Sequence, residues 1–227
     1  MKQITKRLYQ LSLGAVNAFL LEDDGVTLVD TGLPSSTDKI FAALRAAGKN
    51  PADIKRIILT HLHADHSGSA AEIQRQTNAR VYAHHTDAPL LEQGISSRPL
   101  TLTPGLVNKL IYHFIIKGPI TSVAPVAVDE TLSDGDVLPL LGGVQVVHTP
   151  GHSAGHVALL LRNEGVLIAA DLCSHAVGLA YSTLYEDREL GRQSILKSSA
   201  LSFDTAVFGH GRPLQGQANE QLRAKFA

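Results

Sequence analysis

Six consecutive residues of this sequence contain three histidines and one aspartate: His61, His63, Asp65 and His66. An apolar run, Ile57-Ile58-Leu59, precedes them and predicts a buried strand. In extended backbone His61 and His63 point to the same side, whereas Asp65 and His66 lie past a bend and aim at a neighbouring point. Imidazole and carboxylate are ligands for Zn, Mn and Fe. Burying four such groups without a cation would leave polar atoms and a charge uncompensated, so the stretch predicts two adjacent metal sites.

Three further residues with metal-ligand chemistry follow predicted strands: His152, Asp171 and His210. With the first cluster they make seven ligands, which divide into three and three with one carboxylate bridging. Each metal then has four protein ligands and keeps a position for a shared water, as catalytic sites do. Two ions about 3.5–4 Å apart can lower the pKa of a bridging water to about 7 and polarise a substrate oxygen. The seven residues therefore predict a catalytic centre with two divalent ions, zinc first, with manganese or iron as alternatives.

The composition of the chain indicates which kinds of partner it can bind and in which cellular compartment it is expected. The chain has 227 residues, of which 44% are hydrophobic, and a net charge of -1. That balance gives no electrostatic case for binding nucleic acid or an acidic membrane surface, so the expected partner is a small-molecule substrate. The single cysteine excludes an internal disulfide and fits the cytoplasm. We see no signal peptide and no apolar stretch long enough to span a membrane.

The elements that position these ligands alternate between strand and helix. A faint repeat runs through them: the hairpin over residues 17–30 resembles the hairpin over 157–171, and each ends in an aspartate. The repeat predicts an α/β fold in one domain, residues 1–227, built as a four-layer αββα sandwich with two facing sheets and helices outside. Expected strands cover residues 17–21, 26–29, 54–60, 80–84, 144–147, 157–161, 166–170 and 206–208, and expected helices cover 35–47, 67–77, 185–201 and 220–226.

Residues 86–125 differ in character from the rest. Five prolines punctuate the segment, and an apolar helix is expected over residues 106–116 with Tyr112, His113 and Phe114 on it. We interpret the segment as a helical insertion that covers the active-site cleft. The same apolar stretch would serve equally well as the contact of a homodimer.

The order of the motifs resembles that of the metallo-β-lactamase-fold hydrolases. The motifs are His-x-His-x-Asp-His at 61–66, Pro-Gly-His at 150–152, a strand-ending aspartate at 171 and Gly-His-Gly at 209–211. The resemblance implies that one metal is held by His61, His63 and His152, and the other by Asp65, His66 and His210, with Asp171 bridging. It also implies that Asp30 orients the ligand imidazoles.

This sequence lacks features that are typical of particular branches of that superfamily, and each missing feature makes one activity less expected. Zinc β-lactamases of the cysteine-containing class place Cys where Asp171 stands and Arg where His66 stands, so antibiotic hydrolysis is not expected as the main role. Glyoxalase II enzymes carry a C-terminal helical domain, whereas few residues follow His210 here. Nucleases of the superfamily carry a basic arm, which this chain lacks. Quorum-quenching lactonases usually place Tyr three residues after the bridging aspartate, where this chain has Ser174.

The resulting hypothesis is a hydrolase in which a metal-bridging hydroxide attacks the carbonyl of a small ester, lactone or thioester. Asp65 is the expected catalytic residue that accepts or relays the proton. Two alternatives stay open: a glyoxalase II-like thioesterase and a mononuclear iron dioxygenase acting on a persulfide. The number of metal ions bound per chain would distinguish the dioxygenase, which holds one iron, from the two kinds of hydrolase. Cys173 is expected to pack, and His148 and His156 to make hydrogen bonds in the loop around His152.

Overall fold

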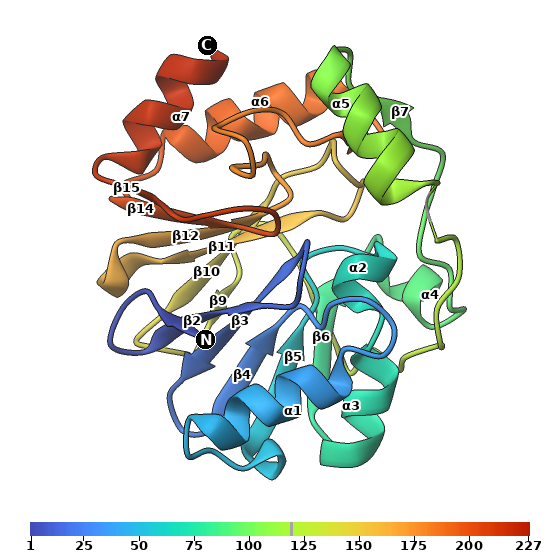
Figure 1. Cartoon of the computed structure of the whole chain (residues 1–227). Coiled ribbons are helices and arrows are strands. Elements are labelled where there is room, and N and C mark those ends of the chain that lie inside the picture. The colour runs from blue at the N-terminus through green and yellow to red at the C-terminus, as the bar shows by residue number, and fades with distance from the viewer. Residues whose placement is uncertain (119) are drawn as a thin grey trace.

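The computed structural model describes residues 1–118 and 120–227; Pro119, within the expected insertion, lies outside the described residues. Two facing sheets form the centre of the molecule (Figure 1). The first runs in the order β1 (Lys2–Gln3), β2 (Leu8–Ser12), β3 (Asn17–Glu22), β4 (Val26–Val29), β5 (Ile54–Ile58), β6 (Arg80–His84), β8 (Glu130–Leu132). The second runs β15 (Leu214–Gln215), β14 (Thr205–Phe208), β12 (Val166–Ala170), β11 (Val157–Leu161), β10 (Val144–His148), β9 (Val137–Leu138).

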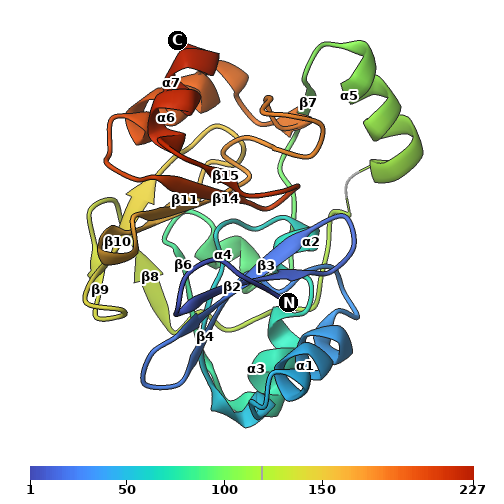
Figure 2. The same ribbon diagram turned by 60° about the vertical axis from the view of Figure 1, so that its left-hand side comes forward.

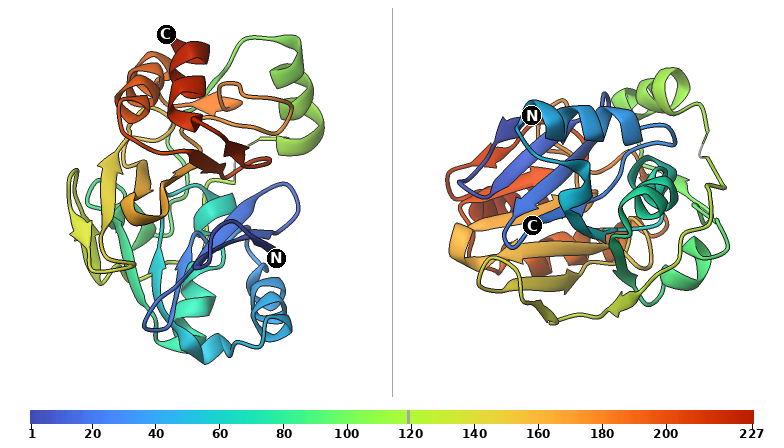
Figure 3. Two further views of the ribbon diagram at one scale, coloured as in Figure 1. Left: turned by 90° about the vertical axis from the view of Figure 1, so that its left-hand side faces the viewer. Right: turned by 90° about the horizontal axis from the view of Figure 1, so that it is seen from below.

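Helices cover the outer faces of both sheets. In Figures 1 and 3, α1 and α3 lie outside the first sheet and α6 and α7 outside the second. The expected αββα sandwich is therefore confirmed. The helical elements are α1 (Thr37–Ala46), η1 (Pro51–Asp53), α2 (Ala64–Ser67), α3 (Ala70–Thr77), α4 (Ala88–Leu91), α5 (Leu106–Ile111), η2 (Tyr112–Ile116), η3 (Arg162–Glu164), α6 (Arg188–Ser199) and α7 (Ala218–Phe226).

Alternation along the central strands explains the layers. In β3, Phe19 and Leu21 pack between the two sheets, whereas Leu20 points to the helices of the first half. In β11, Leu159 packs between the sheets and Leu160 points to the helices of the second half. All five side chains are buried. Because successive side chains of a strand face opposite sides, a strand with apolar residues on both faces must be covered on both.

The two halves repeat the same connection. Strands β3 and β4 form an antiparallel hairpin and β4 then pairs in parallel with β5. In the second half β11 and β12 form the hairpin and β12 pairs in parallel with β14. Asp30, after β4, and Ala170, at the end of β12, both have positive φ, at 61° and 46°. The faint sequence repeat thus corresponds to a structural one, which brings the carboxyl ends of these strands to one edge.

Two expected helix boundaries were wrong. The helix expected over residues 67–77 is divided into α2 and α3, because the amide of Gly68 donates to the carbonyl of Gly32 rather than continuing the helical ladder. The helix expected from residue 185 begins at Arg188, because the side chain of Asp187 caps it by accepting from the amide of Leu190 at 3.0 Å.

The expected insertion is only partly helical. It contains α4, β7 (Thr101–Leu102), α5 and η2, and β7 pairs antiparallel with β13 (Leu184–Tyr185). Figure 2 shows α5 standing away from the sandwich. In the described parts of the chain, no helix has both the length and the apolar character that crossing a bilayer needs.

Candidate metal centre

The seven residues expected as ligands converge at one edge of the sandwich. Their nitrogen and oxygen atoms form overlapping groups, each within 4.8 Å. The groups are His61, His63 and His152; His61, His66 and Asp171; and Asp65, His66 and His210. The first and third match the two sets that the sequence resemblance implied. The loops after β5, β10, β12 and β14 supply five of them and helix α2 supplies Asp65 and His66, so the carboxyl ends of these strands build the site.

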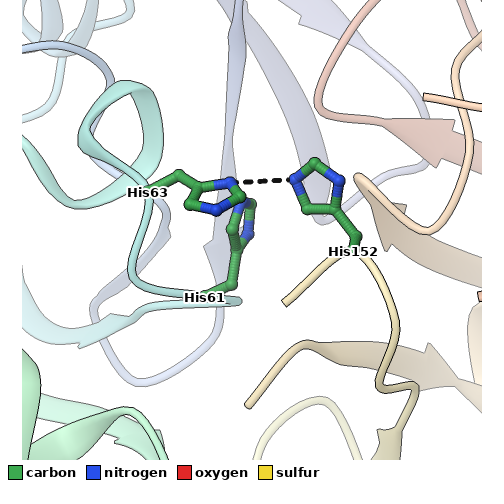
Figure 4. A group of neighbouring side chains, drawn as sticks. All are labelled: His61, His63 and His152. Atoms are coloured by element: carbon green, nitrogen blue, oxygen red, sulfur yellow. Dashed lines mark hydrogen bonds between the residues drawn. The ribbon is translucent and has the colours of Figure 1, made fainter. Parts of the chain in front are cut away.

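Three imidazoles form the more buried half of the centre. Nδ1 of His63 and Nε2 of His152 lie 3.0 Å apart, and the two rings point toward each other (Figure 4). The ring of His61 stands edge-on to both, with centroids 4.6 Å and 4.8 Å away. All three side chains are buried. His61 and His63 come from the first half of the fold and His152 from the second. Three neutral imidazole nitrogens meeting in this way form a ligand set of the kind that zinc prefers.

Asp171 lies between the two halves of the centre. Its Oδ2 is 3.4 Å from Nε2 of His152 and 3.1 Å from Nε2 of His210, and its Oδ1 is 3.4 Å from Nε2 of His66. Asp65 completes the second half, with Oδ2 3.3 Å from Nε2 of His210. One carboxylate thus contacts imidazoles of both ligand sets, as a bridging ligand must.

The second half of the centre is the open one. The side chains of Asp65 and His210 are 35% and 27% exposed, whereas those of His66 and Asp171 are almost fully buried. A substrate can therefore reach the centre from the side of Asp65 and His210.

Asp30 orients two of the ligand imidazoles. Nδ1 of His66 donates to Oδ2 of Asp30 at 2.8 Å. The amide and hydroxyl of Thr60 also donate to Asp30, at 2.8 Å or slightly longer. Because the hydroxyl proton of Thr60 points to Asp30, its oxygen accepts from Nδ1 of His61 at 3.0 Å. The amide and the hydroxyl of Thr31 both donate to the carbonyl of His66. The expectation that Asp30 orients the imidazoles agrees with these contacts.

Backbone carbonyls set the tautomers of two other ligands. Nδ1 of His152 donates to the carbonyl of Leu184, and Nδ1 of His210 to that of Ala15, both at 2.8 Å. A carbonyl only accepts, so the proton of each neutral ring lies on Nδ1. Nε2 of His152 then presents a lone pair to the carboxylate of Asp171, 3.4 Å away, which is a repulsive arrangement unless a cation lies between them.

Buried polar atoms without hydrogen bonds agree with this requirement. Within residues 1–118 and 120–227, Nε2 of His61, Nε2 of His66 and Oδ1 of Asp171 make none. Buried polar atoms are almost always paired in native proteins. Their convergence, together with the chemistry of the donor set, fits divalent cations coordinated by nitrogen and oxygen.

The local charges also favour a cation here. Burial lowers the pKa of His66 and His210, but the carboxylates of Asp171 and Asp65 outweigh it and raise both well above the usual value. Burial lowers the pKa of His152 to about 3 and that of His63 to about 4, so these rings are neutral near pH 7.

A buried network that sequence reasoning missed supports the loops that carry three ligands. Asp87 accepts from the amide of Leu62, which lies between His61 and His63, at 3.1 Å. Arg98 donates to Asp87 at 2.8 Å and to Glu186 at 3.3 Å. Glu186 in turn accepts from the amide of Ala154, two residues after His152, at 2.9 Å. No motif signals these contacts, because they join residues far apart in the sequence.

A cavity of about 410 Å³ lies between the insertion and β13. Its lining includes Arg98, Leu100, Tyr112 and Leu184. Since the carbonyl of Leu184 accepts from His152, this cavity adjoins the metal centre.

Other candidate residues have structural roles. His156 is buried: it hydrogen-bonds with Thr149 at 2.7 Å and accepts from the amide of Asp171 at 3.2 Å. That confirms the expected hydrogen-bonding role. Cys173 is fully buried, and burial raises the pKa of its thiol, which agrees with packing. His84 stacks on His148, with ring centroids 4.1 Å apart.

The chain belongs to the metallo-beta-lactamase superfamily, whose family model matches residues 11–210. It is 29% identical to the probable metallo-hydrolase YflN of Bacillus subtilis, over 95% of this chain and 88% of that protein. It is 30% identical to a hydroxyacylglutathione hydrolase of Rhodopseudomonas palustris, over 80% of this chain and 58% of that protein. It is 29% identical to an N-acyl homoserine lactonase of Bacillus cereus, over 64% of this chain and 58% of that protein. The chain is thus similar to metallo-hydrolases.

Solved structures share the fold. The metallo-beta-lactamase family protein TTHA1429 of Thermus thermophilus superposes with a TM-score of 0.73 at 25% identity, covering 98% of this chain and 80% of that one. The subclass B3 metallo-beta-lactamase BJP-1 of Bradyrhizobium japonicum gives 0.72 at 23% identity, covering 99% and 89%. These likenesses agree with the two-sheet sandwich described above.

Proposed function

We propose that this protein is a two-metal hydrolase that cleaves a small ester, lactone or thioester. The observation that carries the proposal is the position of Asp171, whose two oxygens face imidazoles of both ligand sets. Zinc is the ion that suits this donor set best, with manganese and iron as alternatives. His61, His63 and His152 would hold one ion, Asp65, His66 and His210 the other, and Asp171 both.

When bound, two such ions supply Lewis acidity that lowers the pKa of a water and polarises a carbonyl oxygen. The protein contributes orientation: Asp30, Thr60 and two backbone carbonyls aim the imidazole lone pairs inward. Asp65 is suited to accept a proton from the attacking water. Burial raises its pKa, but His66 and His210 outweigh that effect and hold it below the usual range, so the carboxylate is ionised near neutral pH.

The substrate class rests on two supports. Relatives bear the names hydroxyacylglutathione hydrolase and N-acyl homoserine lactonase, and both names denote attack at an acyl carbon. The cavity beside Leu184 is lined by polar residues such as Ser97 and Thr121 as well as by Leu100 and Tyr112. Such a lining fits a small molecule with both polar and apolar parts.

A substrate panel on metal-loaded protein tests this proposal. Lactones, thioesters, simple esters and β-lactams are offered to the protein as purified, after chelation, and after zinc or manganese is restored. We expect turnover of a lactone, thioester or ester that chelation abolishes and metal restores. One bound iron per chain, with oxygen consumption on a persulfide, would instead establish the dioxygenase alternative and overturn the hydrolase.

A further inference from the structure

The segment from residue 93 to residue 128 contains no acidic residue. It carries Lys109 and Lys117, and also Arg98, which pairs with Asp87 and Glu186, whereas the rest of the chain has four more acidic than basic residues. Lys109 and Lys117 are both exposed. The near-neutral charge of the whole chain, which argued against an acidic membrane surface as a partner, therefore averages over a locally basic segment.

The helix formed by α5 and η2 turns its polar side toward the protein. Oδ1 of Asn108 accepts from the hydroxyl of Thr183 at 3.4 Å. One turn further on, Tyr112 lines the cavity that it shares with Leu184. Asn108 and Tyr112 lie four positions apart, on one face of a helix. That face is the one that meets the body of the protein.

The opposite face is apolar and exposed. Leu106 is 72% exposed and Phe114 is 65% exposed, and Val107, Leu110 and Ile115 are exposed as well. Figures 2 and 3 show α5 projecting from the sandwich, with open space on its outer side. A surface helix of a globular protein normally has its apolar side inward and its charged side outward. Here large apolar side chains point outward beside two exposed lysines, which marks an interaction surface.

Charge decides what occupies this surface. A two-fold contact with a second copy would bring the face onto itself, and its charged residues, Lys109 and Lys117, would repel without an acidic group of the segment to pair with. An apolar helical face accompanied by lysines is instead the arrangement of helices that lie in the interface of an anionic bilayer.

We propose that α5 and η2 dock this protein on an anionic lipid bilayer. The apolar side chains of Leu106, Leu110 and Phe114 enter the headgroup region, and Lys109 and Lys117 contact lipid phosphates. The docking is peripheral, because eleven residues over α5 and η2 are too few to span a bilayer. It does not depend on the metal centre or on the proposed activity.

Co-sedimentation with vesicles tests this inference. The protein is mixed with vesicles of phosphatidylcholine and phosphatidylglycerol, or of phosphatidylcholine alone, at low and high salt. We expect binding to the mixed vesicles that weakens at high salt, and little binding to phosphatidylcholine alone. Equal binding to both vesicles, or none to either, would overturn the proposal.

Matched variants separate this face from the rest of the surface. Leu110→Asp with Phe114→Asp should reduce binding by about tenfold or more, whereas Val137→Asp, at an exposed apolar position on β9, should not change it. Lys109→Glu with Lys117→Glu should weaken binding, whereas Lys2→Glu with Lys6→Glu, equal in charge, should do so much less. Circular dichroism checks that each variant is folded. A dimer in sedimentation velocity that Leu110→Asp dissociates would assign the face to a second copy and contradict the proposal.

Discussion

The imidazole of His66 donates from Nδ1 to Oδ2 of Asp30 at 2.8 Å, and both side chains are fully buried. The same carboxylate holds Thr60, which in turn accepts from His61. One buried acid thus sets the orientation of an imidazole in each ligand set. Groups that orient metal ligands in this way contribute to metal affinity without touching the ion.

Asp30→Asn tests that role. Asn lacks the charge, and only one of its side-chain atoms accepts, so it cannot hold both His66 and Thr60 as Asp30 does. We expect metal affinity to fall by about 10–100-fold, measured by competition with a chromophoric chelator. Asp24→Asn is the matched control, because Asp24 is exposed and pairs with surface residues. Unchanged affinity in folded Asp30→Asn would remove the orienting role.

Arg98→Met tests the network behind the loops of His61, His63 and His152. Burial raises the pKa of Asp87, which is 1% exposed, and Arg98 opposes that effect. Removing the guanidinium leaves a buried carboxyl group without its cation, so we expect a loss of about 2–3 kcal/mol in the free energy of unfolding. Urea denaturation measures it.

The control for the Arg98 variant is Arg56→Met, which breaks a pair with the exposed Asp24. That change should cost about 1 kcal/mol or less. If the two variants lose the same free energy, the buried network is no more important than a surface ion pair.

Gly209→Ala should damage the metal centre while leaving the sheets intact. A Cβ at this position would overlap Oδ1 of Asp171 and lie 2.7 Å from Cε1 of His66. Both side chains would have to move, and the displaced side chain of Asp171 is the carboxylate that both ligand sets share. We expect reduced metal content, measured by elemental analysis, together with a native circular dichroism spectrum. Full metal content in Gly209→Ala would show that the centre tolerates displacement of Asp171.

His84 should make stability depend on pH. Burial, with His148 and His85 nearby, lowers its pKa to about 4, against 6.5 as the usual value. Between these values the unfolded chain binds a proton that the folded chain does not, so stability falls as pH falls through this window. His84→Asn keeps an acceptor for the amide of Thr86 but cannot titrate. Urea denaturation across the window should give a flatter pH dependence for the variant; an unchanged slope would contradict the shift.

Most strands and helices could be predicted from the sequence, because each shows the spacing of apolar residues that is typical of its type. The strand before His61 and the hairpin before Asp171 are apolar runs bounded by turn residues, and both exist as expected. The convergence of the seven candidate ligands was predictable because parallel strands end at one edge. Gly68, which interrupts a helix by bonding to Gly32, was not predictable from its neighbours in sequence.

The Arg98 network shows the limit of such reasoning. Arg98 joins Asp87 and Glu186, and no periodicity links those positions. The sequence shows that α5 is rich in apolar residues. Which side of the helix faces solvent could not be predicted from the sequence, because it depends on the contacts of Asn108 and Tyr112 with the body of the protein. Tertiary contacts decide both features.

Metal stoichiometry of the native chain beside Asp171→Ala tests the central claim most directly. Both proteins are reconstituted with excess zinc, freed of unbound metal, and analysed for zinc per chain. The account predicts two ions for the native chain and one or none for Asp171→Ala, since the variant loses the only oxygen ligand placed to contact both ligand sets among the described residues. Two ions retained by a folded Asp171→Ala variant, or none in the native chain, would contradict it.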